Sequence, residues 1–365
     1  MTNPTLFTPF TVRNLTIRNR VWVPPMCMYS ALGKDGVPTD FHRAHYGAMA
    51  LGGAGLIIVE ATAVSPEGRI SFHDLGIWND AQVQAFKPIT ALMRDNGAVP
   101  GIQIAHAGRK ASTYPGWGYD GIDGSVPVEE GGWQTVSASA NAFEGYAPAH
   151  ALTEEGIAQV VADFAAAARR SVEAGFQVLE IHAAHGYLIH QFLSPLTNER
   201  TDDFGGPLKN RARLLLDIVR AIRAVVGEEI VLFVRFSATD WIEGGWNEEE
   251  TSIVTDWVKD LGVDTVDIST GGLVAGADIP VGPGYQVPLA HYVKEHAHLP
   301  TSAVGMITTA AQANEIITSG RADAVMLGKE HLRDPHFALR AAAELGEKIS
   351  YGTPQYQWAP FPRSE

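Results

Sequence analysis

The sequence has little cysteine and no long apolar run. Cys27 is the single cysteine among 365 residues, which excludes an intrachain disulfide and argues against an iron–sulfur centre held by the cysteines of one chain. No stretch approaches the roughly 18 uninterrupted apolar residues of a membrane helix, and the first residues lack the basic and apolar regions of a signal peptide. These absences predict a cytoplasmic protein in a reducing compartment, without a membrane partner.

Charge is also sparse. Charged residues make up 19% of the chain, the net charge is −14, and Lys and Arg form no long run. A nucleic-acid surface or an anionic-membrane surface needs clustered cations, so neither is predicted. The hydrophobic content of 45% is sufficient for a large core. The composition therefore favours a globular protein that acts on small molecules.

Short apolar, β-rich runs alternate along the chain with segments of helical spacing. The eight runs are Val21–Pro24, Gly55–Glu60, Gly101–Ala105, Gln177–His182, Ile230–Phe236, Thr265–Ser269, Thr301–Val304 and Ala324–Leu327. The helical segments are Asn79–Asn96, Thr153–Ala174, Leu208–Val226, Glu248–Leu261, Thr309–Ser319 and Pro335–Leu345. This order predicts an α/β fold, a (β/α)8 TIM barrel in which residues 1–365 form one domain. No G-x-G-x-x-G follows the first run, which counts against a Rossmann fold.

Three segments depart from the alternation. The segment TVRNLTIRNR (11–20) predicts a hairpin that caps the bottom of the barrel. Residues 107–151 are rich in Gly, Trp, Tyr and Ser and predict a lid inserted after the third strand. Residues 350–365 predict an irregular tail whose aromatic residues suit a subunit interface or packing within the chain.

The stretch Glu180–Pro195, EIHAAHGYLIHQFLSP, concentrates polar chemistry at the end of a predicted strand. In a barrel, catalytic groups gather after the strands. The N–H groups of neutral His182 and His185 would hold a carbonyl or phenolate oxygen, and the phenol of Tyr187 would donate a proton. A single buried histidine is more often structural, but three such groups at one strand end favour a catalytic site.

Five motifs occur in a fixed order: PPMCMY (24–29), GAGLIIVEATAV (53–64), IQIAHAGRKA (102–111), HAAHGYLIHQFLSP (182–195) and NERTDDFGGPLKNR (198–211). With them, nearly the whole chain resembles the Old Yellow Enzyme family of flavin-dependent ene-reductases, in particular its thermophilic-like branch with the xenobiotic reductases. The resemblance implies FMN at the barrel mouth, reduced by NADPH or NADH. It also implies hydride transfer from flavin N5 to an activated C=C bond in enones, maleimides or nitroalkenes.

The resemblance assigns the cofactor-binding residues by position. It implies that Gln103 faces the pyrimidine edge of the flavin and that Arg235 places positive charge near N1 and C2=O. It further implies ring packing by Pro25, Met26 and Ala61, tuning by the Cys27 thiol, and a phosphate site at Gly305, Gly328 and Lys329. Relatives usually carry arginine at the last position, and lysine keeps its charge without the bidentate geometry.

The same resemblance assigns the catalytic residues. His182 and His185 would bind the oxygen of the electron-withdrawing group, Tyr187 would protonate Cα, and Tyr29 would be a second phenol near that oxygen. Trp358 would reach a neighbouring subunit's substrate site in a homodimer or homotetramer. Two alternatives stay open at this point: a metal-dependent barrel hydrolase using the histidine cluster, and a flavin-binding barrel without catalysis.

Overall fold

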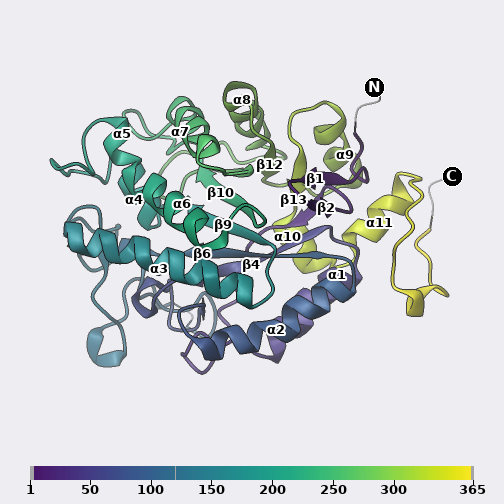
Figure 1. Ribbon diagram of the computed structural model, residues 1–365, viewed down its shortest axis with the longest axis horizontal. Coiled ribbons are helices and arrows are strands. Elements are labelled where there is room, and N and C mark those ends of the chain that lie inside the picture. The colour runs from purple at the N-terminus through teal and green to yellow at the C-terminus, as the bar shows by residue number, and fades with distance from the viewer. Residues whose placement is uncertain (1–3, 120, 363–365) are drawn as a thin grey trace.

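The computed structural model describes residues 4–119 and 121–362 and contains a closed parallel barrel. In Figure 1 the barrel strands lie at the centre with helices around them. β3 pairs with both β13 and β4, which closes the ring. The barrel strands are β3 (Val21–Val23), β4 (Leu56–Ala63), β6 (Val99–Ala105), β9 (Val178–Ala183), β10 (Val231–Ser237), β11 (Thr265–Ser269), β12 (Thr301–Val304) and β13 (Ala324–Met326). Every predicted run became a strand, so the predicted fold class is confirmed.

Helices cover the outside of the barrel (Figure 1). The longer ones are α1 (Asp40–Leu51), α2 (Asp80–Asp95), α3 (Glu154–Glu173), α6 (Arg213–Val226), α7 (Glu248–Asp260), α8 (Val287–Ala297), α9 (Ala310–Thr318) and α11 (Phe337–Glu344). Short helices are α4 (Leu188–Leu193), α5 (Leu208–Arg211) and α10 (Gly328–Arg333). The sequence did not predict α1, with its internal Gly47, or α8, with Pro288 in its first turn, because both residues weaken the helical signal. None of the helices described is long and apolar enough to cross a membrane.

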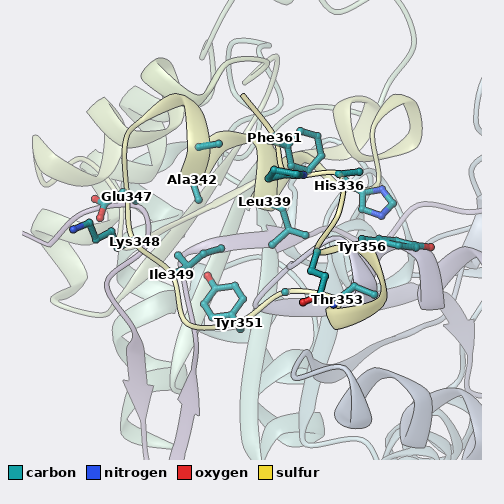
Figure 2. A pocket seen from close by; sticks show the side chains of 15 residues that line it. His336, Leu339, Ala342, Glu347, Lys348, Ile349, Tyr351, Thr353, Tyr356 and Phe361 are labelled. Atoms are coloured by element: carbon teal, nitrogen blue, oxygen red, sulfur yellow. The ribbon is translucent and has the colours of Figure 1, made fainter. Parts of the chain in front are cut away.

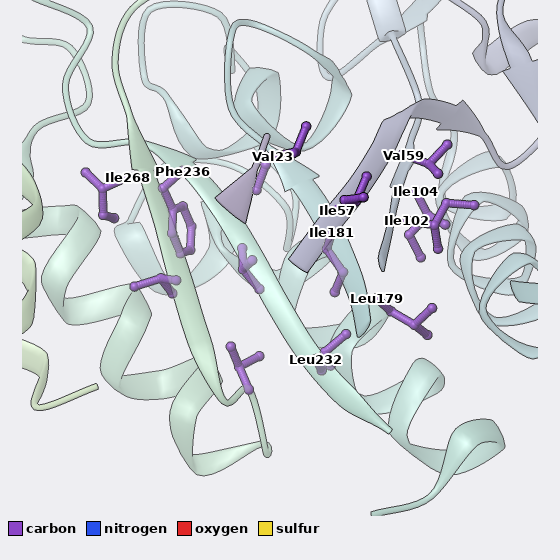
Figure 3. Close-up of a cluster of buried hydrophobic side chains, with 14 of the residues drawn as sticks. Val23, Ile57, Val59, Ile102, Ile104, Leu179, Ile181, Leu232, Phe236 and Ile268 are labelled. Carbon is purple, nitrogen blue, oxygen red and sulfur yellow. The ribbon is translucent and has the colours of Figure 1, made fainter. Parts of the chain in front are cut away.

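Strand alternation separates the barrel wall into two surfaces. Outward-facing residues such as Ile104, Ile181 and Phe236 pack between the barrel and the helices (Figure 3). Inward-facing residues at the strand starts, such as Val178 and Phe233, form a separate apolar cluster. Because successive strand residues point to opposite faces, the inner positions further along each strand are left for polar side chains.

The predicted N-terminal hairpin is present as β1 (Phe10–Val12) and β2 (Leu15–Ile17), which pair antiparallel. Phe10 and Ile17 belong to the inner apolar cluster, and the Phe10 ring meets the Trp22 ring edge-on at 5.4 Å between centroids. The hairpin thus fills the end of the barrel where the strands begin. Chemistry is therefore confined to the opposite end.

The insertion after the third barrel strand contains little regular structure: 3-10 turns at 108–110 and 128–130, and a short pair of strands, β7 (Val136–Ser137) and β8 (His150–Ala151). It is attached to loops that follow two different strands. The Trp117 indole N–H donates to the Met28 carbonyl oxygen at 2.8 Å, and the Trp133 indole N–H donates to the Glu67 carbonyl oxygen at 2.8 Å. The insertion therefore lies on the face of the barrel where the strands end. Its boundaries, and the single-domain assignment, stay predictions.

Candidate active site

Three predicted catalytic side chains lie together where β9 ends. The His182 ring lies 5.2 Å from the His185 ring and 4.9 Å from the Tyr187 ring, both edge-on and measured between centroids. The turn between them requires glycine, because Gly186 has φ of 72° and a Cβ there would lie 2.3 Å from the Gly272 carbonyl oxygen. This tight turn brings two imidazole rings and a phenol from one short segment close together.

The protonation states of these groups follow from their surroundings. Burial, followed by the positive charge of Arg235, lowers the pKa of His182 and of His185 well below 6.5, so both rings are neutral. Burial raises the pKa of Tyr187 well above 10 and keeps its phenol protonated. His182 Nδ1 accepts the Ala184 N–H at 3.3 Å, so the ring proton is on Nε2. That Nε2–H has no partner in residues 4–119 and 121–362, so it is free to donate.

His185 differs from His182 because its Nε2 already has a hydrogen-bond partner. Its Nε2 lies 2.7 Å from Ser269 Oγ, and the Ser269 hydroxyl donates to Gln286 Oε1 at 3.2 Å. Gln286 Nε2 donates to the Val304 carbonyl oxygen at 3.1 Å, which fixes Oε1 as the acceptor. His185 therefore carries its ring proton on Nε2, and this N–H donates a hydrogen bond to Ser269 Oγ. To bind a substrate oxygen, this N–H must leave Ser269, an arrangement that the sequence did not indicate.

The loop after β3 carries the remaining predicted groups near the flavin ring. Cys27, Ala61 and Tyr187 pack in one small apolar cluster. Burial, then the negative charges of Asp74 and Glu60, raises the pKa of Cys27 well above 9, so the group is a thiol and not a nucleophilic thiolate. Glu60 Oε2 accepts the Met28 N–H at 2.7 Å and so holds the loop in place.

Tyr29 completes this loop. It has a positive φ of 50°, an uncommon conformation for a tyrosine, and its phenol is protonated because burial and the neighbouring Cys27 raise its pKa. Its ring edge lies 3.0 Å from the position that a Cβ on Gly116 would occupy. Tyr29 is therefore enclosed between the first loop and the insertion.

A cavity of about 410 Å³ opens at the ends of β10 to β13. Its lining includes four predicted cofactor residues from three different strand ends: Arg235, Gly305, Gly328 and Lys329. Gly305 has φ of 118°, and a Cβ there would lie 2.8 Å from Gln286 Nε2. Because Gly305 has no side chain, its backbone itself forms this part of the cavity wall.

Inside the barrel, below this cavity, polar side chains from five consecutive strands form a line that we call the polar belt: Gln103, Glu180, Arg235, Asp267 and Ser302. The Gln103 amide N–H donates to Glu180 Oε1 at 2.8 Å, Arg235 Nε lies 2.9 Å from Asp267 Oδ2, and Ser302 donates to Asp267 Oδ1 at 3.1 Å. The Gln103 amide is thereby oriented, and its oxygen has no hydrogen-bond partner in the described chain.

Lys110 was not among the predicted site residues, although it lies in the motif at 102–111. Lys110 Nζ donates to the His185 carbonyl oxygen at 2.9 Å and to the Gly272 carbonyl oxygen at 2.8 Å. Nζ also lies 5.2 Å from the centroid of the Tyr187 ring. Burial, then the nearby Arg109, lowers the pKa of Lys110 to about 8. Its position in that motif could not show these long-range contacts.

Trp358 does not meet the other predicted site residues within its own chain. The tail packs beside α11, with a cavity of about 620 Å³ between them that is lined by apolar residues such as Leu339, Ile349 and Phe361 (Figure 2). Thr353 Oγ1 donates to the Leu51 carbonyl oxygen at 3.0 Å, which holds the tail against α1. Trp358 itself is 88% exposed.

Comparison with known proteins identifies the family. Residues 5–348 match the NADH:flavin oxidoreductase / NADH oxidase family. The chain belongs to this family. It is 49% identical over 355 residues to an NADPH dehydrogenase of Listeria monocytogenes, covering 97% of this chain and 98% of the relative. An NADPH dehydrogenase of Bacillus subtilis is 46% identical over 345 residues, covering 94% and 96%. The structure of the old yellow enzyme homologue from Zymomonas mobilis superposes with a TM-score of 0.78 at 30% identity, covering 99% and 97%.

The expected membership of the Old Yellow Enzyme family is confirmed, and this family member is an FMN-dependent oxidoreductase that uses a nicotinamide reductant. The residues present fit FMN. The 410 Å³ cavity combines a buried guanidinium, that of Arg235, with two glycine positions and a lysine, which suits a planar ring system joined to a phosphate.

The metal-hydrolase alternative is wrong. Family membership assigns a flavin oxidoreductase, and residues 4–119 and 121–362 contain no group of three or more His, Cys, Asp or Glu side chains arranged to hold a metal. His190 Nε2 instead lies 3.0 Å from Asp240 Oδ1, and its Nδ1 accepts the Gly186 N–H at 2.9 Å. Both ring nitrogens are thus used to hold the turn after β9.

Proposed function

We propose that the protein catalyses NADPH-dependent reduction of activated C=C bonds in enones, maleimides and nitroalkenes. One observation carries the proposal: the ring of neutral His182, whose proton is on Nε2, lies 4.9 Å between centroids from the ring of the protonated Tyr187. A hydrogen-bond donor for an oxygen next to a proton donor for carbon is the pair that such a reduction needs. NADPH, in place of NADH, is proposed because two NADPH dehydrogenases share nearly half of the sequence.

Bound FMN would supply the hydride that reaches Cβ of the substrate. Around it, His182 would donate Nε2–H to the carbonyl or nitro oxygen, where negative charge develops. His185 would add a second donor after leaving Ser269. Tyr187 would give its Oη proton to Cα, and Tyr29 would lie at the opposite wall beneath the insertion.

The cofactor contacts follow from the same arrangement. Gln103, whose amide nitrogen is held by Glu180, would present its oxygen to the N–H of the flavin pyrimidine edge. Arg235 would lie near N1 and C2=O. Gly305, Gly328 and Lys329 would hold the phosphate. Lys329 places a single flexible charge where relatives have a forked guanidinium. This charge would be sufficient to bind the phosphate if backbone N–H groups act as further donors.

The ring would pack against the loop after β3. Pro25 and Met26 come from this loop, and a Cβ on Gly328 would be 3.5 Å from Met26 Sδ, so the loop and the phosphate end are adjacent. Cys27 would lie near N5 and C4=O as a neutral thiol, where it tunes the reduction potential through a weak hydrogen bond. Ala61 would complete the apolar surface.

The tail would act between subunits. Trp358 is 88% exposed, and an apolar cavity lies between the tail and α11. The tail therefore presents an aromatic side chain that a second copy of the chain could contact. We therefore propose a homodimer or homotetramer in the cytoplasm, in which Trp358 contributes to the neighbouring subunit's substrate site. Trp358→Ala should change substrate range without loss of FMN, and an unchanged range would make the tail a packing element.

The test of the proposed function is an anaerobic visible spectrum of the purified protein before and after NADPH, followed by 2-cyclohexenone. Bleaching of a flavin spectrum by NADPH and its recovery with the enone are the expected results. Bleaching without recovery would remove simple enones from the substrates. A flavin spectrum that NADPH does not bleach would support the flavin-binding barrel without catalysis.

A further inference from the structure

Glu180 has an unusual place in the polar belt. Its Oε1 accepts the Gln103 amide N–H at 2.8 Å, but its Oε2 is buried without a hydrogen-bond partner among the described residues. The nearby guanidinium of Arg235 is directed to Asp267, with Nε 2.9 Å from Oδ2. Two buried carboxyl groups thus share one cation, and one negative charge is left over when both are ionised.

The charge of Glu180 depends on Arg235. Burial, then the negative charge of Asp267, raises the pKa of the Glu180 carboxyl to about 8, while Arg235 opposes this rise. These are the charged groups that act on Glu180, because Gln103 is uncharged and the neighbouring His182 is neutral. Any new negative charge beside Arg235 therefore favours the protonated form of Glu180.

We propose that Glu180 takes up a proton from solvent when the FMN above Arg235 is reduced, and releases it when the FMN is reoxidised. This inference rests on the proposed function, because it requires Arg235 at the pyrimidine edge. Transfer of hydride from NADPH forms NADP⁺, consumes no solvent proton and leaves one more negative charge at the bound cofactor. A solvent proton then forms an O–H bond at Glu180 Oε2, so the charge inside the barrel stays balanced through the reaction.

The test counts protons during reduction. The FMN-loaded protein is mixed anaerobically with one equivalent of NADPH at pH 8 in weak buffer containing a pH indicator, and flavin bleaching is recorded at the same time. Because a group with a pKa of about 8 is half ionised at pH 8, we expect an uptake of about half a proton per FMN. Glu180→Gln should abolish this uptake. Asp74→Asn is the matched control, because Asp74 is also a buried carboxyl group but its Oδ2 accepts the Ile70 N–H at 2.6 Å, and it should leave the uptake unchanged.

No uptake by the wild-type protein, or uptake that persists in Glu180→Gln, would overturn the proposal. If the variant fails to hold FMN, the infrared difference spectrum of wild-type protein replaces it. A C=O band of a protonated carboxyl group should appear on reduction and shift when the protein contains ¹³C-glutamate, and its absence would also overturn the proposal. If NADPH fails to bleach the flavin, the proposed function is refuted instead. Photoreduction then tests Glu180 separately, through the difference in proton uptake between the wild type and the variant.

Discussion

Replacing Tyr187 by phenylalanine tests the proposed proton donor with little disturbance of the fold. The Tyr187 Oη has no hydrogen-bond partner in residues 4–119 and 121–362, so its removal leaves no buried group unpaired. The ring contact to His182 at 4.9 Å is preserved by phenylalanine. We therefore expect a change in the free energy of unfolding of less than about 1 kcal/mol.

The chemical effect should be much larger. Loss of a positioned general acid lowers a rate by roughly 10²- to 10⁴-fold, which corresponds to about 3 to 5 kcal/mol in the activation free energy. Only the step that protonates Cα should be affected, because reduction of the flavin by NADPH needs no phenol. Binding of the substrate oxygen through His182 should also be unaffected.

Anaerobic stopped-flow measurements separate the two half-reactions. Bleaching of the flavin by NADPH should proceed at the wild-type rate in Tyr187→Phe, while reoxidation by 2-cyclohexenone should be slower by the factor above. Tyr29→Phe is the matched control, since it removes the second phenol proposed near the substrate and should slow reoxidation far less. Reoxidation of Tyr187→Phe within threefold of the wild-type rate would refute the assignment.

Other expected outcomes concern the cofactor and stability. Lys329→Ala should weaken FMN binding at least about tenfold while Lys329→Arg retains it, as followed by flavin fluorescence during dilution, and equal binding by both variants would show that the lysine does not hold the phosphate. Cys27 should resist iodoacetamide at pH 7.5, because its pKa is raised well above 9, and rapid alkylation seen by mass spectrometry would contradict a thiol that its surroundings keep protonated. Glu60 and Asp74 have pKa values raised to about 8 and about 7, so the native state holds protons that the unfolded state releases. The free energy of unfolding should therefore fall as the pH rises from 7 to 8.5, and urea titrations that show a rise would contradict it.

Much of the barrel could be predicted because its elements have local signatures. Each strand is a short apolar run between helical segments, and the hairpin at 11–20 has its own turn signal. The helix α1 was missed for the complementary reason: Gly47 and its histidines weaken the local pattern, and the helix is stabilised by packing on β4. The predicted helix Leu208–Val226 likewise proved to be two, α5 and α6, which meet at Ala212.

The sequence by itself determined the strand order, the family motifs and the cluster His182, His185 and Tyr187, because these depend on neighbours along the chain. Only the tertiary structure decided which groups those residues meet. The bond from His185 to Ser269 spans 84 residues, and the contact of Lys110 with Gly272 spans 162. The polar belt exists only because the barrel brings inward-facing side chains of five neighbouring strands together, and such contacts leave no periodic trace in the sequence.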